Sequence, residues 1–238
     1  EPPHRGRCAR ASKQEAMDGA PSSLEVTSYD RWFDSTWGAY AFGVERRALG
    51  RVLGDLSGTR VLDAGCGTGR FTRALEEAGA RVIGLDVDPA MARFCAGRTR
   101  GQVVVGDVRR LPFWAGCFDV SVAVTLLEFV DDPQRAVAEL MRATRPRGRV
   151  VLALLNPASL WGMASARRRR RGPWASSHML AASRVAAWCR PYGTVRRHGA
   201  LFAPRAFPGI GRLGPALERL GRRFPRRGAF QLRVVEKR

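Results

Sequence analysis

The chain has 238 residues, of which 45% are hydrophobic and 26% charged, and its formal net charge is +20 at pH 7. This composition excludes a wholly disordered or low-complexity chain, and no apolar run is long enough to cross a bilayer. The five widely spaced cysteines do not suit a disulfide framework or a CxxC metal site, and no apolar segment follows the N-terminal arginines, so we expect a cytoplasmic protein without a secretory signal.

The N-terminal region changes character at Tyr29. Residues 1–23 contain prolines, glycines and charges without a periodic apolar face, which predicts a disordered tail. Residues 24–238 show no linker or repeat, so we expect a single domain. This domain opens with residues 29–42, called the aromatic segment below. Its large aromatic residues include Tyr29, Trp32, Phe33 and Trp37.

Strand and helix patterns alternate from residue 60 onward. Short apolar runs predict strands at residues 60–63, 82–85, 103–105, 118–124 and 149–155. Apolar residues recur at helical spacing between these runs, and Asp-Pro pairs at 88–89 and 132–133 are typical helix starts. The alternation predicts an α/β fold with a parallel sheet covered by helices on both faces.

The pattern is less regular after residue 155. Residues 156–173 read as a long connection, and we expect its basic run at 167–171 to be a solvated, mobile loop. A helix is expected at 179–189, and two late strands at 195–202 and 230–235 are expected to pair antiparallel. Prolines and glycines punctuate the segment between these strands, and we assign no regular element to it.

A glycine-rich turn follows the first expected strand. It reads Asp63-Ala64-Gly65-Cys66-Gly67-Thr68-Gly69. Glycines let the backbone approach a ligand closely, and the N-terminus of the next helix adds amide donors and the positive end of its dipole. A dinucleotide fingerprint would need its third glycine where Arg70 stands, which disfavours a nicotinamide or flavin oxidoreductase.

Two carboxylates follow the next two expected strands. Asp86 lies about 20 residues beyond the turn, where an acidic side chain can accept hydrogen bonds from both ribose hydroxyls of an adenosine. The alternative role of helix cap is already filled by Asp88, which precedes Pro89. Asp107 ends the third strand, where it either accepts from an adenine amino group or serves as an ordinary turn aspartate.

Taken together, these motifs resemble the class I S-adenosylmethionine-dependent methyltransferases, and more closely their small-molecule "type 11" group. The resemblance covers residues 28–158 and rests on four stretches: residues 61–69, residues 84–86, Gly106-Asp107 with residues 111–113, and Phe118-Asp119. It implies a Rossmann-like seven-stranded, mostly parallel sheet with an antiparallel C-terminal strand pair. It also implies a methyltransferase that uses S-adenosylmethionine and releases S-adenosylhomocysteine.

The resemblance assigns residues to the methionine end of the cofactor. Asp63 and the turn formed by Gly65, Cys66 and Gly67 would line this end. Thr125, just past the fourth strand, would contact the cofactor through its backbone.

Other positions are assigned to the adenosine end by the same resemblance. Asp86 would hold the ribose, with Val87 and Met91 flanking the adenine. Asp107 and the amide of Val108 would meet the adenine edge.

The acceptor side is less defined. Tyr29 resembles a residue that covers the cofactor in relatives, and we expect the aromatic segment to close over the cleft, or alternatively to pack on one face of the sheet.

Methyl transfer proceeds by in-line displacement, so a general base is needed only when the acceptor must lose a proton. We therefore assign no catalytic residue and no metal. His178 and His198 are candidate bases or ordinary structural residues, and Glu128-Phe129 stands where many relatives have two histidines.

The expected partner is a small-molecule methyl acceptor, and two alternatives remain. The high positive charge suits an RNA methyltransferase. However, only two of the 41 basic residues are lysines, a bias that a GC-rich genome also produces, and residues 125–128 lack an Asn/Asp-Pro-Pro-aromatic motif. The second alternative is a non-catalytic cofactor-binding or nucleic-acid-binding protein on the same fold. The oligomeric state is not predicted.

Overall fold

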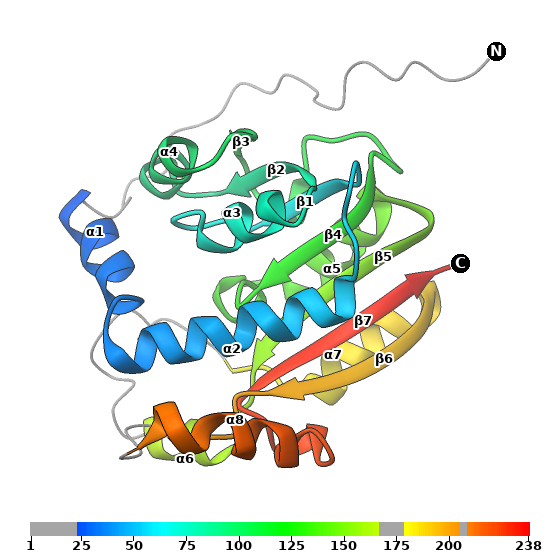
Figure 1. The fold of residues 1–238 in the computed structure, drawn as a ribbon. Coiled ribbons are helices and arrows are strands. Elements are labelled where there is room, and N and C mark those ends of the chain that lie inside the picture. Colours follow the sequence, from blue (N-terminus) through cyan, green and yellow to red (C-terminus); the bar gives the residue numbers. More distant parts are fainter. Residues whose placement is uncertain (1–22, 167–178, 205–208) are drawn as a thin grey trace.

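A seven-stranded sheet organises the chain in the computed structural model, which describes residues 23–166, 179–204 and 209–238. The strand order is β3-β2-β1-β4-β5-β7-β6 (Figure 1). The strands are β1 (Arg60–Ala64), β2 (Arg81–Asp86), β3 (Gln102–Val105), β4 (Phe118–Val124), β5 (Thr144–Leu155), β6 (Gly193–Ala200) and β7 (Phe230–Lys237). Strands β1 to β5 pair in parallel, whereas β7 runs antiparallel to β5 and β6. The predicted sheet and its antiparallel C-terminal pair are confirmed.

Helices cover both faces of the sheet, as expected. In β4, Val120 and Val122 belong to the core on one face and Ala123 to the core on the other, as the two-residue period of a strand requires. On the first face lie α2 (Thr36–Leu53) and α3 (Arg70–Glu77). On the second lie α5 (Pro133–Ala143) and α7 (Ala182–Cys189).

The predicted Asp-Pro helix starts are confirmed. Asp88 caps α4 (Pro89–Arg98) by accepting a hydrogen bond from the Ala90 amide at 2.8 Å. Asp132 caps α5 by accepting from the Arg135 amide at 3.0 Å. Each cap satisfies a backbone donor that the first helical turn leaves unpaired.

The sequence patterns did not predict the helices α1 (Ser23–Trp32), α6 (Leu160–Ala166) and α8 (Ile210–Gly221). Gly214 of α8 serves packing. A Cβ atom added at Gly214 would lie 2.7 Å from the Tyr40 ring, so glycine allows α8 to approach α2 closely. Glu218 of α8 accepts from the amides of Leu201 and Phe202 at 3.0 and 2.7 Å, which fixes the helix to the chain after β6.

Some predictions fall on residues 1–22, 167–178 and 205–208, which lie outside the described residues. These predictions are the N-terminal tail, the basic run at 167–171 and His178. Among the residues that the structure describes, none of the helices combines the length and apolar character needed to traverse a membrane.

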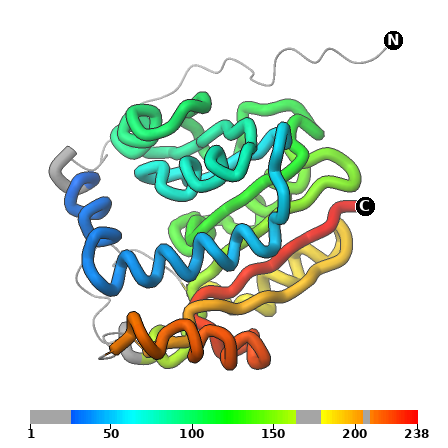
Figure 2. Tube along the Cα trace, in the orientation of Figure 1, coloured from blue at the N-terminus to red at the C-terminus, as the bar shows by residue number. Residues whose placement is uncertain are grey.

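An ionic network fixes α1 beside the glycine-rich turn. Asp30 accepts from Arg70 at 2.9 Å through each carboxylate oxygen, and from Arg98 at 2.7 and 2.8 Å. Arg98 also donates to the Thr68 carbonyl at 2.9 Å. Although burial opposes ionisation, hydrogen bonds from Arg98 and Arg70 hold the pKa of Asp30 well below its usual range. Figure 2 shows α1 at the edge of the molecule, between α4 and the start of α2.

Replacement of Asp30 by asparagine is expected to lower the free energy of unfolding by about 2–4 kcal/mol, because two partly buried arginines lose their carboxylate. Asp34→Asn is the matched control, since Asp34 also binds Arg70, at 2.8 Å, but its side chain is 65% exposed. The control should lose less than about 1 kcal/mol. Urea denaturation measures both values, and equal losses would contradict the stabilising role of Asp30.

Candidate cofactor and acceptor site

The glycine-rich turn lies at the point where the order of strands along the sheet reverses. The chain continues toward β2 after β1 and toward β5 after β4, so the carboxyl ends of β1 and β4 form the crevice where α/β sheets bind ligands. Gly65 has a φ of 72°, and a Cβ atom there would lie 2.6 Å from the Leu126 side chain. Glycine is therefore required at this position for conformation and for space.

Gly67 provides an open stretch of backbone in the same turn. Its φ is 52°, and a Cβ atom added there would meet no atom within 4 Å. The N-terminus of α3 begins three residues later, at Arg70, and contributes the positive end of a helix dipole. A ligand can thus approach the Gly67 backbone directly.

Asp86 ends β2 and faces this turn. Its Oδ2 accepts from the Gly67 amide at 2.8 Å, and its Oδ1 accepts from the Asp88 amide at 3.0 Å. An ionised carboxylate offers about four acceptor positions, so capacity remains for a ribose hydroxyl. Burial raises the pKa of Asp86, while these backbone hydrogen bonds act in the opposite direction. The position and the remaining acceptor capacity fit an adenosine-containing cofactor.

Asp63 lies beneath the turn. It is 1% exposed and accepts from the Thr72 hydroxyl at 2.6 Å, and burial raises its pKa to about 6. Asp63 does not line the cavity described below, and in this structure it binds α3. Its predicted role at the methionine end stays a prediction. Cys66 lines the cavity, and a hydrogen bond with Cys95, together with burial, raises the pKa of its thiol.

The residues predicted for the adenine end gather near the ends of β2 and β3. Val87 is 47% exposed, and Val108 begins a short 3-10 helix, η1 (Val108–Arg110). Met91 lies in the first turn of α4. Asp107 caps η1 by accepting from the Arg109 amide at 2.8 Å and also pairs with the Arg109 guanidinium. Asp107 therefore has the ordinary turn role, which was one of its two predicted roles. Its contact with the adenine stays a prediction.

A cavity extends from the glycine-rich turn to the ends of β4 and β5. Of the predicted cofactor residues, Tyr29, Gly65, Cys66, Gly67 and Thr125 line it. Thr125 has a φ of 47°, and its amide donates to the Ala153 carbonyl at 2.8 Å. A left-handed threonine is strained, and such strain is concentrated at functional sites.

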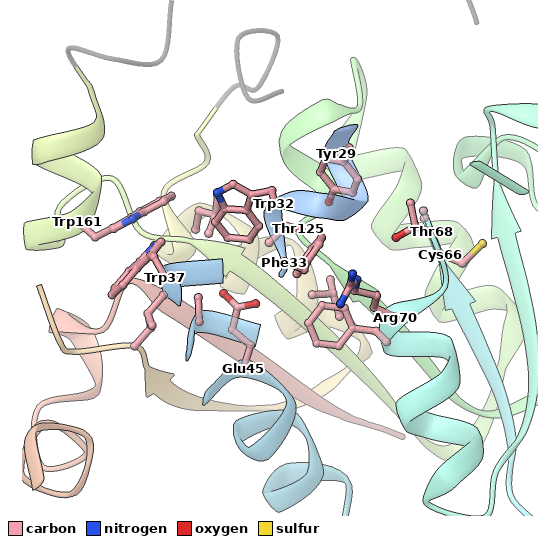
Figure 3. A pocket seen from close by; sticks show the side chains of 17 residues that line it. Tyr29, Trp32, Phe33, Trp37, Glu45, Cys66, Thr68, Arg70, Thr125 and Trp161 are labelled. Atoms are coloured by element: carbon pink, nitrogen blue, oxygen red, sulfur yellow. The ribbon is translucent and has the colours of Figure 1, made fainter. Parts of the chain in front are cut away.

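Side chains of the aromatic segment line the cavity and also pack against the core on one face of the sheet, and the predicted closure of the segment over a bound cofactor stays a prediction. Trp32, Phe33 and Trp37 all line it, and the rings of Trp32 and Phe33 pack edge to face at 5.0 Å. Figure 3 shows these side chains grouped opposite the turn that carries Cys66 and Thr68. The segment does more than fill one face of the sheet, since it forms a wall of the site.

Glu45 and Trp161 are among the cavity residues that the sequence did not predict. Glu45 of α2 is 9% exposed, and burial raises its pKa to about 8. The available signal was its spacing of four residues from Ala41 and Leu49, both in the core. Trp161 of α6 also lines the cavity, and no sequence signal marked it because its helix was not expected.

Glu128 lies just past β4 and outside the cavity lining. It is 0% exposed, its Oε1 accepts from the Leu155 amide at 2.7 Å, and its Oε2 has no hydrogen-bond partner within the described part of the chain. Burial raises the pKa of Glu128 to about 7. The candidate base His198 lies in β6 and does not line the cavity. Within the described ranges, no group of three or more His, Cys, Asp or Glu side chains could hold a metal ion.

Comparisons with known proteins identify the family of the chain. The family model described as "Methyltransferase domain" matches residues 62–152. The malonyl-[acyl-carrier protein] O-methyltransferase of Pectobacterium atrosepticum is 35% identical over 137 residues, covering 57% of this chain and 54% of that protein. The protein of the same name from Pseudescherichia vulneris is 32% identical over 168 residues, covering 67% of each chain. The chain belongs to the class I S-adenosylmethionine-dependent methyltransferases.

The structural comparison supports the same family fold. A solved S-adenosylmethionine-dependent methyltransferase from Thermotoga maritima superposes with a TM-score of 0.72 and 21% identity, covering 91% of this chain and 98% of that one. S-adenosylmethionine is the cofactor, as the sequence predicted. The chain spans between about half and two thirds of the length of the two curated methyltransferases.

Asp86→Ala should weaken binding of S-adenosylhomocysteine by about 1.5–3 kcal/mol, or roughly 10- to 150-fold, because a charge-assisted hydrogen bond to the ribose is lost. Asp55→Ala is the control, since Asp55 is exposed and bonds only locally, to Ser57. Calorimetric titration gives both affinities. A folded Asp86→Ala variant with unchanged affinity would place the ribose elsewhere.

Glu128→Gln should reduce the pH dependence of stability. The unfolded chain releases the Glu128 proton near pH 4.5, whereas burial keeps it bound up to about pH 7 by raising the pKa. The free energy of unfolding therefore falls as pH rises through this window, by up to about 3 kcal/mol for this group. Asp63 and Glu45, whose pKa values are also raised, add slopes of the same sign.

The variant should consequently be more stable than the parent at pH 8 and similar to it at pH 4.5. Urea denaturation at both pH values measures this, with Glu77→Gln, a half-exposed carboxylate on α3, as the control. A parent and a variant with the same pH slope would contradict the buried, protonated state of Glu128.

Proposed function

We propose that this chain transfers the methyl group of S-adenosylmethionine to a small-molecule acceptor bound beneath the aromatic segment. The observation that carries the proposal is the continuity of one cavity from the cofactor turn to the acceptor wall. Gly65 and Gly67 line one end, while Trp37 and Trp161 line the other. An acceptor at that end would lie next to the methionine end of the cofactor.

Each part of the site would have a distinct task in this reaction. The backbone at Gly67 and the carboxylate of Asp86 would hold the cofactor, which supplies an electrophilic methyl group on a cationic sulfur. The aromatic residues Trp32 and Phe33 would exclude water and orient the acceptor. Alignment of this kind contributes up to about 7–11 kcal/mol to a two-substrate reaction. The acceptor atom displaces the sulfur in line with the breaking C–S bond.

The enclosure of the acceptor end favours a small molecule over a nucleic-acid strand. Helices α1 and α2 provide Trp32 and Trp37, α6 provides Trp161, and the chain after β6 provides Leu201. A base within a strand would need room for its neighbouring nucleotides at this end. The names of the curated relatives suggest a malonyl oxygen as one acceptor to test.

Incubation with methyl-labelled S-adenosylmethionine and a cell extract tests the proposal. We expect label in the low-molecular-weight fraction, with malonyl-coenzyme A and total RNA assayed separately as defined acceptors. The Asp86→Ala variant is the control, because weaker cofactor binding should reduce the label at low cofactor concentration. Label confined to RNA or protein would contradict a small-molecule acceptor, and a lack of transfer into any fraction would contradict the methyl-transfer proposal.

A further inference from the structure

Glu45 is a carboxyl group enclosed in the acceptor end of the cavity. It projects from the inner face of α2, where Ala41 and Leu49, one turn away on either side, are in the core. Figure 3 shows its carboxylate pointing into the cavity, with Trp32, Trp37 and Trp161 to one side. Among the described residues, no hydrogen bond or ion pair reaches this carboxylate, although it is 9% exposed. A buried carboxyl without a cation is kept largely neutral by its raised pKa, and it ionises when a ligand supplies the cation.

The charges near Glu45 are already balanced without it. Besides Glu45, the titratable or charged side chains that line the cavity are Tyr29 of α1, Cys66 of the turn and Arg70 of α3. Arg70 binds Asp30 at 2.9 Å and Asp34 at 2.8 Å, and Asp30 also binds Arg98. Two arginines and two aspartates therefore cancel. An ionised Glu45 gives this end of the cavity a net negative charge.

The surrounding aromatic rings suit a positively charged ligand. The faces of Trp side chains attract ammonium groups, and a cage of aromatic rings with a carboxylate is a recurrent way to bind alkylammonium ions. Trp161 also has its Nε1 buried without a hydrogen-bond partner among the described residues. This donor is available to a second polar atom of the same ligand. The wall therefore combines an anion, aromatic faces and one N–H donor.

We infer that the methyl acceptor is an amine, which binds as an ammonium ion to Glu45 between Trp32, Trp37 and Trp161. The inference rests on the proposed methyl-transfer function. The ammonium gives one proton to the Glu45 carboxylate, which leaves a neutral amine with a lone pair. The nitrogen then forms a bond to the methyl carbon while the C–S bond breaks, and its electron pair stays on the sulfur. The products are a methylammonium ion and a neutral thioether, and Glu45 returns its proton to solvent.

The raised pKa of Glu45 supports its assignment as the group that takes a proton from the ammonium ion. Burial raises the pKa of Glu45 to about 8, so its affinity for a proton is closer to that of an amine than an ordinary carboxylate would have. An approaching ammonium ion lowers the pKa of Glu45 again and favours the ion pair. A carboxylate acceptor would instead meet Glu45 as a like charge, which disfavours it.

The first test identifies the atom that receives the methyl group without knowing the acceptor. The protein is incubated with S-adenosylmethionine carrying ¹³C in the methyl group and the low-molecular-weight fraction of a cell extract. Proton–carbon correlation spectra then separate N-methyl, O-methyl and C-methyl products. New N-methyl signals are expected. O-methyl or C-methyl signals alone would overturn the amine inference while leaving small-molecule methyl transfer intact, and an unlabelled fraction would contradict the proposed function itself.

The second test compares Glu45→Gln with Glu77→Gln, a carboxylate on α3 with its side chain 52% exposed. Glu45→Gln should lower N-methyl formation by about 100-fold or more, as loss of a base and ion-pair partner implies. Its affinity for S-adenosylmethionine should stay within about twofold of the parent. Glu77→Gln should match the parent in both measurements. Weaker cofactor binding with an unchanged acceptor KM would assign Glu45 to the cofactor and overturn the inference.

The third test measures cation binding without chemistry. The parent and both variants, saturated with S-adenosylhomocysteine, are titrated with tetramethylammonium chloride against sodium chloride at equal ionic strength, and tryptophan fluorescence is recorded. A saturable change specific to tetramethylammonium is expected in the parent and in Glu77→Gln, with at least tenfold weaker binding in Glu45→Gln. Equal responses to both salts in the parent, or equal binding by all three proteins, would overturn the inference.

Discussion

The hydrogen bonds of Asp30 with Arg70 and Arg98 fix the aromatic segment to the helices that frame the cofactor turn. Arg70 opens α3, directly after the turn that follows β1, and Arg98 ends α4, which follows β2. The same helices therefore position both the glycine-rich turn and the aromatic wall of the cavity. Because Asp30 holds the two arginines through both carboxylate oxygens, α1 cannot shift without disturbing the charge balance beside the turn.

Carboxyl groups with raised pKa values surround the site. Burial acts on Asp63 beneath the turn, on Glu128 past β4 and on Glu45 in the cavity wall. Each desolvated carboxyl makes the folded state less stable at neutral pH than an apolar residue of similar volume would. The core on both sides of the sheet offsets this cost. A concentration of unfavourable charge at one edge of the sheet is typical of a functional site.

Local signals predicted much of the fold, and the parts that failed depend on distant contacts. The strands and the caps at Asp88 and Asp132 follow from short sequence patterns, and the structure confirms them. Helix α8 was missed because Gly214 reads as a helix breaker until Tyr40 is known to pack against it. The sequence used Arg70 only to exclude a GxGxxG fingerprint. Its ion pair with Asp30 was not predicted, because the two residues are 40 positions apart in the chain.

The contact between Gly65 and Leu126 bears on how this enzyme family diversifies. Because the Leu126 side chain occupies the space beside Gly65, a larger residue in the turn after β1 would require Leu126, in the turn after β4, to move or to be replaced. Substitutions at Gly65 and Leu126 are therefore constrained when the substrate range of the family changes. Helix α6 and the first turns of α2 lie outside this contact, so mutations in them are expected to reshape the far wall of the cavity without changing the glycine-rich turn. Evolutionary change in substrate range is expected to accumulate in those helices, and directed evolution has its widest freedom there.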